Sequence, residues 1–248
     1  MRLDVFFGAH GHTSADVQGR VVVVIDVLRA STTIAVALAN GARMVIPFES
    51  AEEAITRSKS FERGEYKLAG ERRKQRIPGF DLGNSPLEYA SEVVDGTTIL
   101  FTTTNGTGAL IAAQSAREVI VGAYVNFTVV SAMVRAAARA KSDIAILAAG
   151  SERHFSLEDA ACAGRYVRAI RRGLPDAELN DGAIAALQLE KRYGNDLARL
   201  FAESTHGRAL AEAGFADDLA VCGTIDGHPV VPVYQDRQVT RLGPDRER

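Results

Sequence analysis

The chain has 248 residues, of which 46% are hydrophobic, and its 29 basic and 31 acidic residues give a formal net charge of −2. This length allows one large domain or two small ones, and the charge balance excludes the strong basic field that binds nucleic acid. No apolar stretch approaches the roughly 20 residues that a membrane span needs, and the N-terminus lacks the apolar segment of a signal peptide. Two cysteines, Cys162 and Cys222, are too few for a disulfide framework, so we expect a reducing, cytoplasmic location.

Strand and helix patterns alternate along most of the chain. Short runs of valine, isoleucine and leucine predict strands covered on both faces, at residues 3–8, 21–27, 43–48, 66–70, 97–103, 118–123, 143–149 and 230–242. Helices are predicted at residues 31–40, 51–63, 85–94, 106–116, 126–140, 157–172, 184–193 and 196–203. The alternation predicts a layered α/β fold with a mostly parallel sheet and flanking helices.

Beyond residue 173 the alternation gives way to successive helices and a closing strand. No linker, repeat or low-complexity segment separates this part from the rest. We predict a single unit over residues 1–248, with a change of sublobe near residue 173 as the alternative.

The first polar segment lies where the strand at residues 21–27 runs into a helix. It carries Asp26, Arg29 and the hydroxyls of Ser31, Thr32 and Thr33. A helix start favours an anion, hydroxyls add donors, and an arginine can grip phosphate oxygens in pairs. Asp26 would repel a phosphate unless it holds a metal ion or acts on the nucleophile. The alternative is a Ser/Thr helix cap beside a structural Asp–Arg pair.

A second turn of this kind, Thr102-Thr-Thr-Asn105-Gly106-Thr107-Gly108, follows the strand at residues 97–103. Its glycines permit close backbone approach and its hydroxyls supply donors, as in turns that cradle phosphate. It is not a Walker loop, because no Gly-Lys-Ser/Thr follows. The alternative is a helix start that needs glycine for its own dihedral angles.

The third segment, residues 70–88, is basic and punctuated by glycine. Four bases lie between Arg72 and Arg76, and Ser85-Pro86-x-Glu88 has the pattern of a helix start. That pattern leaves the preceding Asn84 without an explanation. A long basic loop could close over an anionic substrate, and a merely solvated loop is the alternative.

The fourth segment follows the strand at residues 143–149. After a turn that contains His154, Ser156 caps a helix and places Glu158 and Asp159 in its first turn. Favourable helix capping explains these acids locally. Adjacent carboxylates near two anion-binding turns nevertheless need a counterion, and Mg²⁺ is the natural one because it favours hard oxygen ligands and bridges carboxylates to phosphate.

Several familiar hydrolase patterns are missing. The five histidines show no HExxH spacing, neither cysteine begins a C-x5-R loop, and Asp26 lacks a D-x-D pattern. His10-Gly-His12 could bind a metal, although a surface loop is the better interpretation. The C-terminal residues 241–248 are predicted to be a frayed tail.

In this order, the segments resemble one family, the Mg²⁺-dependent 2-phosphosulfolactate phosphatases of coenzyme M biosynthesis. The matching pieces are Asp26-Val-Leu-Arg29-Ala-Ser31-Thr32-Thr33, Gly70-Glu-Arg72, Gly83-Asn84-Ser85-Pro86, Thr102-Thr-Thr-Asn105-Gly106-Thr107, Phe155-Ser156-Leu-Glu158-Asp159 and Cys222-Gly-Thr-Ile-Asp226. The resemblance implies an α/β fold of its own type, a Mg²⁺ cofactor and hydrolysis of a phosphomonoester on a small sulfonated hydroxy acid.

The segments and the resemblance together give a hypothesis for the site. Metal binding, directly or through water, is expected at Asp26, Glu158 and Asp159, and catalysis at Asp26 and Arg29. Phosphate binding is expected at Ser31, Thr32, Thr33, Asn105, Gly106 and Thr107, and binding of the substrate's other acidic groups at Arg72, Asn84 and Ser85. Asp26 could be a metal ligand, a general base or a phosphorylated nucleophile.

Two other functions use the same parts. One is a metal-dependent lyase that acts on a phosphorylated small acid, and the other is a non-catalytic module that binds phosphate esters. For the phosphatase we expect a small anionic phosphomonoester as the partner, neither nucleic acid nor membrane, and a homodimer as the assembly to test.

Overall fold

The structure is a computed structural model that describes residues 1–8, 11–152 and 154–243. His10 of the His-Gly-His pair and residues 244–248 of the predicted tail lie outside the described residues. Within these ranges, the helices are too short or too polar for any of them to traverse a lipid bilayer.

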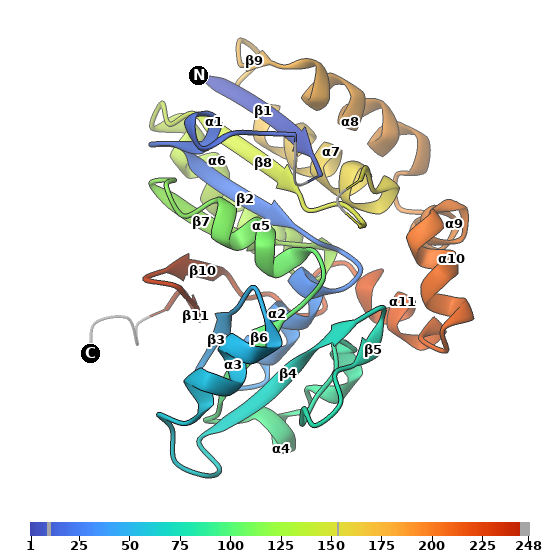
Figure 1. Ribbon diagram of the computed structural model, residues 1–248. Helices are drawn as coiled ribbons and strands as arrows, with labels where there is room; N and C mark the ends of the chain where they lie inside the picture. Colours follow the sequence, from blue (N-terminus) through green and yellow to red (C-terminus); the bar gives the residue numbers. More distant parts are fainter. Residues whose placement is uncertain (9–10, 153, 244–248) are drawn as a thin grey trace.

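The described strands form one sheet of eleven, in the order β5-β4-β6-β3-β11-β10-β7-β2-β8-β1-β9 (Figure 1). Their bounds are β1 (Arg2–Phe7), β2 (Val21–Ile25), β3 (Met44–Pro47), β4 (Tyr66–Arg72), β5 (Gln75–Arg76), β6 (Thr98–Thr102), β7 (Glu118–Gly122), β8 (Ile144–Ala148), β9 (Glu178–Leu179), β10 (Pro232–Gln235) and β11 (Gln238–Arg241).

The sheet contains two parallel groups. Strands β7, β2, β8, β1 and β9 run together, as do β3, β6 and β4, and the antiparallel pair β10–β11 joins the two groups. The arrowheads of β2 and β4 point toward the same region, beside α11 (Figure 1). The predicted α/β fold with a mostly parallel sheet is confirmed.

The helices cover both faces of the sheet. Their bounds are α1 (Ser14–Val17), α2 (Ala30–Ala39), α3 (Ala51–Ser58), α4 (Ser91–Val94), α5 (Gly106–Ala112), α6 (Phe127–Arg139), α7 (Leu157–Arg171), α8 (Asp181–Tyr193), α9 (Leu197–Glu203), α10 (Thr205–Glu212) and α11 (Ala216–Cys222), with 3₁₀ turns at Pro86–Glu88 and Tyr124–Asn126.

Strand β2 shows why the chain folds in layers. All five of its residues are buried, and successive side chains point to opposite faces. Val23 and Ile25 join a core with residues of α6, α7 and α8, while Val22 and Val24 join a second core with residues of α2 and α5. A strand covered on both faces reads as a continuous apolar run, which is why the sequence predicted it.

The structure corrects two predicted elements. The single strand predicted at residues 230–242 is a hairpin of β10 and β11, because Asp236 and Arg237 adopt φ angles of 53° and 63° and turn the chain. The helix predicted at residues 85–94 is interrupted, with a 3₁₀ turn at Pro86–Glu88 and α4 after it.

The C-terminal helices lie in two different regions of the molecule. Helix α8 packs on α7 and β1, whereas α9, α10 and α11 lie beside the carboxyl ends of the strands (Figure 1). These last helices therefore border the region where the polar segments converge. The single unit over residues 1–248, with its alternative near residue 173, stays a prediction.

Candidate active site

Four polar segments meet at the carboxyl ends of the strands. A Cβ atom on Gly106, after β6, would lie 2.7 Å from Asp26 Oδ2, after β2. Glu71 of β4 accepts the Thr104 N–H at 2.8 Å, and Asn105 Oδ1 accepts the Glu152 N–H at 3.0 Å. The strand ends of both parallel groups therefore build one site.

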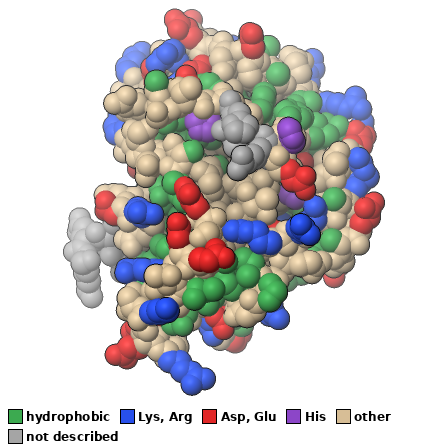
Figure 2. All heavy atoms as spheres, in the orientation of Figure 1, with side chains coloured by type: hydrophobic (Ala, Val, Ile, Leu, Met, Phe, Trp, Pro, Cys, Tyr) green, Lys and Arg blue, Asp and Glu red, His purple; other side chains and the backbone are tan. Residues whose placement is uncertain are grey.

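A pocket of about 450 Å³ opens between these segments. Acidic residues, bases and polar side chains line it together: Asp26, Glu71, Glu152, Arg29, Arg72, Arg73, Lys74, Asn84, Asn105 and His206. Figure 2 shows basic and acidic side chains next to one another on this face of the molecule. The pocket can therefore receive both a cation and an anion.

Asp26 is a buried carboxylate of this pocket with a raised pKa. Its side chain is buried, and its Oδ1 accepts the Ala30 N–H at 3.2 Å. The pKa of Asp26 is raised to about 6, mainly by burial and also by the charges of Glu71 and Glu158, while His206 and the Ala30 hydrogen bond lower it. A carboxylate this poorly stabilised is suited to bind a cation or a proton.

Glu158 lies beside His206. Its Oε1 is 3.1 Å from His206 Nδ1, and its buried Oε2 has no hydrogen-bond partner among the described residues. Burial acts to raise the pKa of Glu158, but the hydrogen bond and charge of His206, together with Ser156, lower it overall. Glu158 is thus an ionised carboxylate with one oxygen left to bind something else.

Asp159 connects two of the converging turns. Its Oδ1 accepts the Val27 N–H at 2.8 Å and its Oδ2 accepts the Gly150 N–H at 3.1 Å. Burial raises its pKa well above the ordinary value, and the charges of Glu158 and Asp26 raise it further. Asp159 therefore fixes the turns after β2 and β8 as well as adding a carboxylate to the cluster.

These carboxylates suit Mg²⁺ in their chemistry. Among the described residues, no three His, Cys, Asp or Glu side chains form a ready-made metal cage. Mg²⁺ does not require one, because it usually keeps several waters and binds one or two carboxylates plus substrate phosphate. The unpartnered Glu158 Oε2 and the perturbed Asp26 match that donor set.

Arg29 connects the pocket to the C-terminal helices. Its Nη1 donates to Asp218 Oδ2 of α11 at 2.6 Å, its Nη2 donates to the Lys74 carbonyl at 3.0 Å, and its guanidinium stacks on Phe215. Arg29 and Asp218 are both 2% exposed, so this is a buried ion pair. The predicted catalytic arginine lines the pocket, and part of its charge is already paired.

The three hydroxyls after Arg29 point into the protein. Ser31 Oγ donates to the Val24 carbonyl at 3.4 Å and accepts the Asp26 N–H at 2.9 Å. Thr32 donates to the Val27 carbonyl, and Thr33 donates to the Asn84 carbonyl. These hydroxyls shape the turn, so a phosphate would contact this segment through other groups.

The turn after β6 is held by a hydrogen-bonded pair of threonines. The Thr103 N–H donates to Thr107 Oγ1, and the Thr107 N–H donates to Thr103 Oγ1, both at 3.2 Å. Asn105 lines the pocket directly, and Gly106 lets α5 begin against Asp26. Thr107 itself is buried and supports the turn from behind.

The basic segment also lines the pocket. Glu71 Oε2 accepts the Lys74 N–H at 2.8 Å, and Arg72 donates to Thr102 Oγ1 at 3.0 Å. Asn84 lines the pocket with a buried Oδ1 that has no partner among the described residues. Ser85 donates to Asp218 Oδ1 at 2.6 Å, so it joins the Arg29 ion pair rather than the pocket surface.

Sequence reasoning missed three residues of this site. Glu71 was visible only as part of the Gly70-Glu-Arg72 match, and no local pattern marked its carboxylate as buried. His206 and Asp218 come from α10 and α11, far along the chain from the four polar segments. Only the tertiary fold brings His206 to the pocket and Asp218 to Arg29, so no spacing in the sequence could have shown them.

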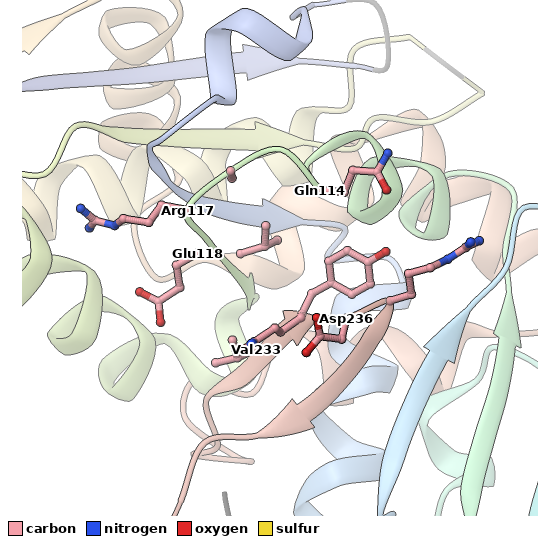
Figure 3. A pocket seen from close by; sticks show the side chains of 10 residues that line it. Gln114, Arg117, Glu118, Val233 and Asp236 are labelled. Atoms are coloured by element: carbon pink, nitrogen blue, oxygen red, sulfur yellow. The ribbon is translucent and has the colours of Figure 1, made fainter.

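A larger hollow of about 590 Å³ lies elsewhere. It lies between the start of β7 and the β10–β11 hairpin, where Arg117, Glu118 and Asp236 line it (Figure 3). Glu118 pairs with Val21, so this hollow adjoins the amino ends of the parallel strands. Ligands of open α/β sheets bind at the carboxyl ends, and the converging carboxylates are there.

The fold and the pocket together define the class of protein to which this chain belongs. This is an α/β protein whose strand ends hold buried carboxylates beside a basic wall, an arrangement for binding an anion together with a cation. A family model described as 2-phosphosulpholactate phosphatase matches residues 8–237.

Curated relatives agree with this match, and all three described below carry the name "Probable 2-phosphosulfolactate phosphatase". The protein from Caldanaerobacter subterraneus subsp. tengcongensis is 46% identical over 217 residues, 88% of each chain. That from Symbiobacterium thermophilum is 43% identical over 227 residues, 92% of this chain and 96% of the relative. That from Thermotoga maritima is 39% identical over 216 residues, 87% and 89% respectively. The chain belongs to the 2-phosphosulfolactate phosphatase family, and the resemblance seen in the sequence is confirmed.

Proposed function

We propose that the protein is a Mg²⁺-dependent phosphatase that hydrolyses 2-phosphosulfolactate to sulfolactate and phosphate. The observation that carries this proposal is the pocket itself, which is lined by the buried carboxylates Asp26 and Glu71 together with several bases. Family membership supplies the reaction, and the names of the relatives supply the substrate.

Asp26 and Glu158 would hold the metal ion. Glu158 Oε2 is buried without a partner among the described residues and Asp26 has a pKa raised to about 6, so both gain from a cation. Asp159 would support them by fixing both turns through its two N–H contacts, or would bind through water. When bound, Mg²⁺ supplies charge neutralisation of the phosphoryl group and orientation of water.

The rest of the pocket would position the ester. The turn at Asn105–Gly106 and the uncommitted N–H groups of the Arg29 guanidinium are the donors proposed for the phosphoryl oxygens. Asn84 Oδ1 could accept a hydrogen bond from the substrate or from water. Asp26 borders the same space, where it could orient or deprotonate the attacking water.

Location and assembly are also proposals. Cys162 and Cys222 are both free and buried, which fits the cytoplasm, and cell fractionation would test it. A homodimer is the assembly we propose to test, by sedimentation of the purified chain.

The activity is tested with a panel of small phosphomonoesters. Phosphate release is measured from 2-phosphosulfolactate, 2-phosphoglycolate and 2-phospholactate, and we expect the sulfonated ester to be preferred. Turnover without phosphate release would favour the lyase. Binding without turnover, unaffected by chelation of Mg²⁺, would favour the non-catalytic module.

A further inference from the structure

The turn between β4 and β5 has an unusual composition for its shape. Arg73 and Lys74 are its two central residues, with φ angles of 52° and 71°, and Arg72 pairs with Gln75 on either side. Two-residue hairpin turns with positive φ at both central positions strongly favour Asn-Gly. Long side chains are disfavoured in this conformation, so these two residues are explained better by function than by the turn.

The backbone of this turn is held from two directions. Glu71 Oε2 accepts the Lys74 N–H, while Glu71 Oε1 accepts the Thr104 N–H of the neighbouring turn. The Lys74 carbonyl accepts a hydrogen bond from Arg29, which the buried Asp218 holds in place. The turn is therefore fixed relative to Asp26 and does not depend on its own dihedral preferences.

The charges of Arg73 and Lys74 have no carboxylate partner in the part of the chain that the structure describes. Arg73 and Lys74 both line the pocket, and no carboxylate of the described residues lies within ion-pair distance of either. Arg72 differs, because its guanidinium already donates to the Glu71 and Glu49 carbonyls and to Thr102 Oγ1. The pocket lining thus contains two cations without a carboxylate partner among the described residues, together with the carboxylate of Asp26.

We propose that Arg73 and Lys74 form a specificity-determining subsite for an anionic group of the substrate other than its phosphate. This inference rests on the proposed phosphatase function, in which the phosphate would lie beside Asp26 and the proposed metal ion. The substrate class is then a phosphomonoester with a second acid group, a carboxylate or a sulfonate. A fixed turn binds such a group without a further ordering cost.

The experiment replaces both residues by the pair that the turn prefers. The double variant Arg73→Asn/Lys74→Gly removes both charges but keeps positive φ favourable, so its melting temperature should not fall. If the double variant were unstable, Lys74→Asn alone would repeat the test. Arg76→Gln is the matched control, because Arg76 lies on β5, is exposed and donates to the Asp81 carbonyl outside the pocket.

Three esters that share one skeleton separate the acid groups: 2-phosphosulfolactate, 2-phospholactate and isopropyl phosphate. We expect the double variant to lose about 10- to 100-fold in kcat/KM on an ester with the recognised acid group, mainly through KM. Isopropyl phosphate should be hydrolysed about as well as by the unaltered protein. A loss only on 2-phosphosulfolactate assigns the sulfonate, and a loss on 2-phospholactate as well assigns the carboxylate.

An unchanged preference in the double variant, or an equal loss on all three esters, would overturn the subsite. Absence of phosphate release by the unaltered protein would instead overturn the proposed function. Calorimetric dissociation constants for the same esters would then decide the subsite, which predicts weaker binding of the acid-bearing esters to the double variant alone.

Discussion

At the scale of single residues, the buried carboxylate of Asp26 lowers the stability of the fold when it is ionised, although the proposed function needs it. The folded protein raises the pKa of Asp26 from 3.8 to about 6, so the folded state retains a proton that the unfolded chain releases. Because the folded state binds more protons in this range, the contribution of Asp26 to stability falls as pH rises from about 4 to about 6. Above that range the ionised carboxylate destabilises the fold, unless a cation accompanies it.

The variant Asp26→Asn should therefore be more stable and much less active. An asparagine can still accept the Ala30 N–H without burying a charge. Without Mg²⁺ at pH 7 we expect the free energy of unfolding to rise by about 1–3 kcal/mol, from the pKa difference. With Mg²⁺ present we expect phosphate release to fall about 100-fold or more. Urea unfolding and a phosphate assay measure the two effects. Full activity in this variant would exclude all three proposed roles of Asp26.

Gly106 sets how closely α5 approaches Asp26. A Cβ atom there would lie 2.5 Å from the Ala30 Cβ and 2.7 Å from Asp26 Oδ2. Gly106→Ala should cost about 1–3 kcal/mol of stability and reduce activity, because the two turns must separate. Gly108→Ala is the control in the same helix, since a Cβ atom there meets nothing within 4 Å. Thermal melts of both variants would check this, and equal behaviour would contradict it.

The placement of some residues could be predicted from the sequence. Asp26, Glu158 and Asp159 do gather at one place, because the carboxyl ends of β2 and β8 are adjacent in the sheet. The hydroxyls of Ser31 and Thr32 could not be assigned in the same way. A polar side chain at a helix start can face a ligand or a backbone carbonyl, and only the tertiary structure shows that these face carbonyls.

At the scale of elements, helix α11 stabilises the pocket through one ion pair. Asp218 accepts hydrogen bonds from both Arg29 and Ser85, and it is 2% exposed. This places a C-terminal helix in contact with the turn after β2 and with the segment after β5.

Asp218→Ala should leave the Arg29 charge buried and unpaired. We expect a loss of about 3–5 kcal/mol in the free energy of unfolding, the usual cost of removing one partner from a buried pair. Asp217→Ala, on the exposed face of the same helix, should change stability by less than about 1 kcal/mol. Urea unfolding curves would compare the two, and similar midpoints would show that the pair contributes little.

Helices and strands were predicted best where the hydrophobic pattern of their own residues determines the secondary structure. Strand β2 and helix α7 have strong local patterns, and the structure places them within two residues of the predicted bounds. The β10–β11 hairpin was missed because Asp236-Arg237 carries no glycine or asparagine to mark a turn. The short strands β5 and β9 exist through pairing with β4 and β1, which local sequence does not encode.

At the scale of the whole molecule, the pocket depends on the joining of two parallel groups. Alternating strands and helices predicted the layers, but not the antiparallel β10–β11 pair that connects β7 to β3. Strands β10 and β11 come from the end of the chain, whereas their neighbours β7 and β3 come from its first half. The connection is therefore a long-range pairing. It brings Asp26 and Glu71, from different groups, to the same pocket.

The most direct test of the account is the rate of phosphate release from 2-phosphosulfolactate as Mg²⁺ is restored to the chelated protein. We expect negligible release without the ion and saturable activation as it is added, and no activation by the ion in Asp26→Asn. Phosphate release that is unaffected by chelation, or that survives in Asp26→Asn, would contradict it.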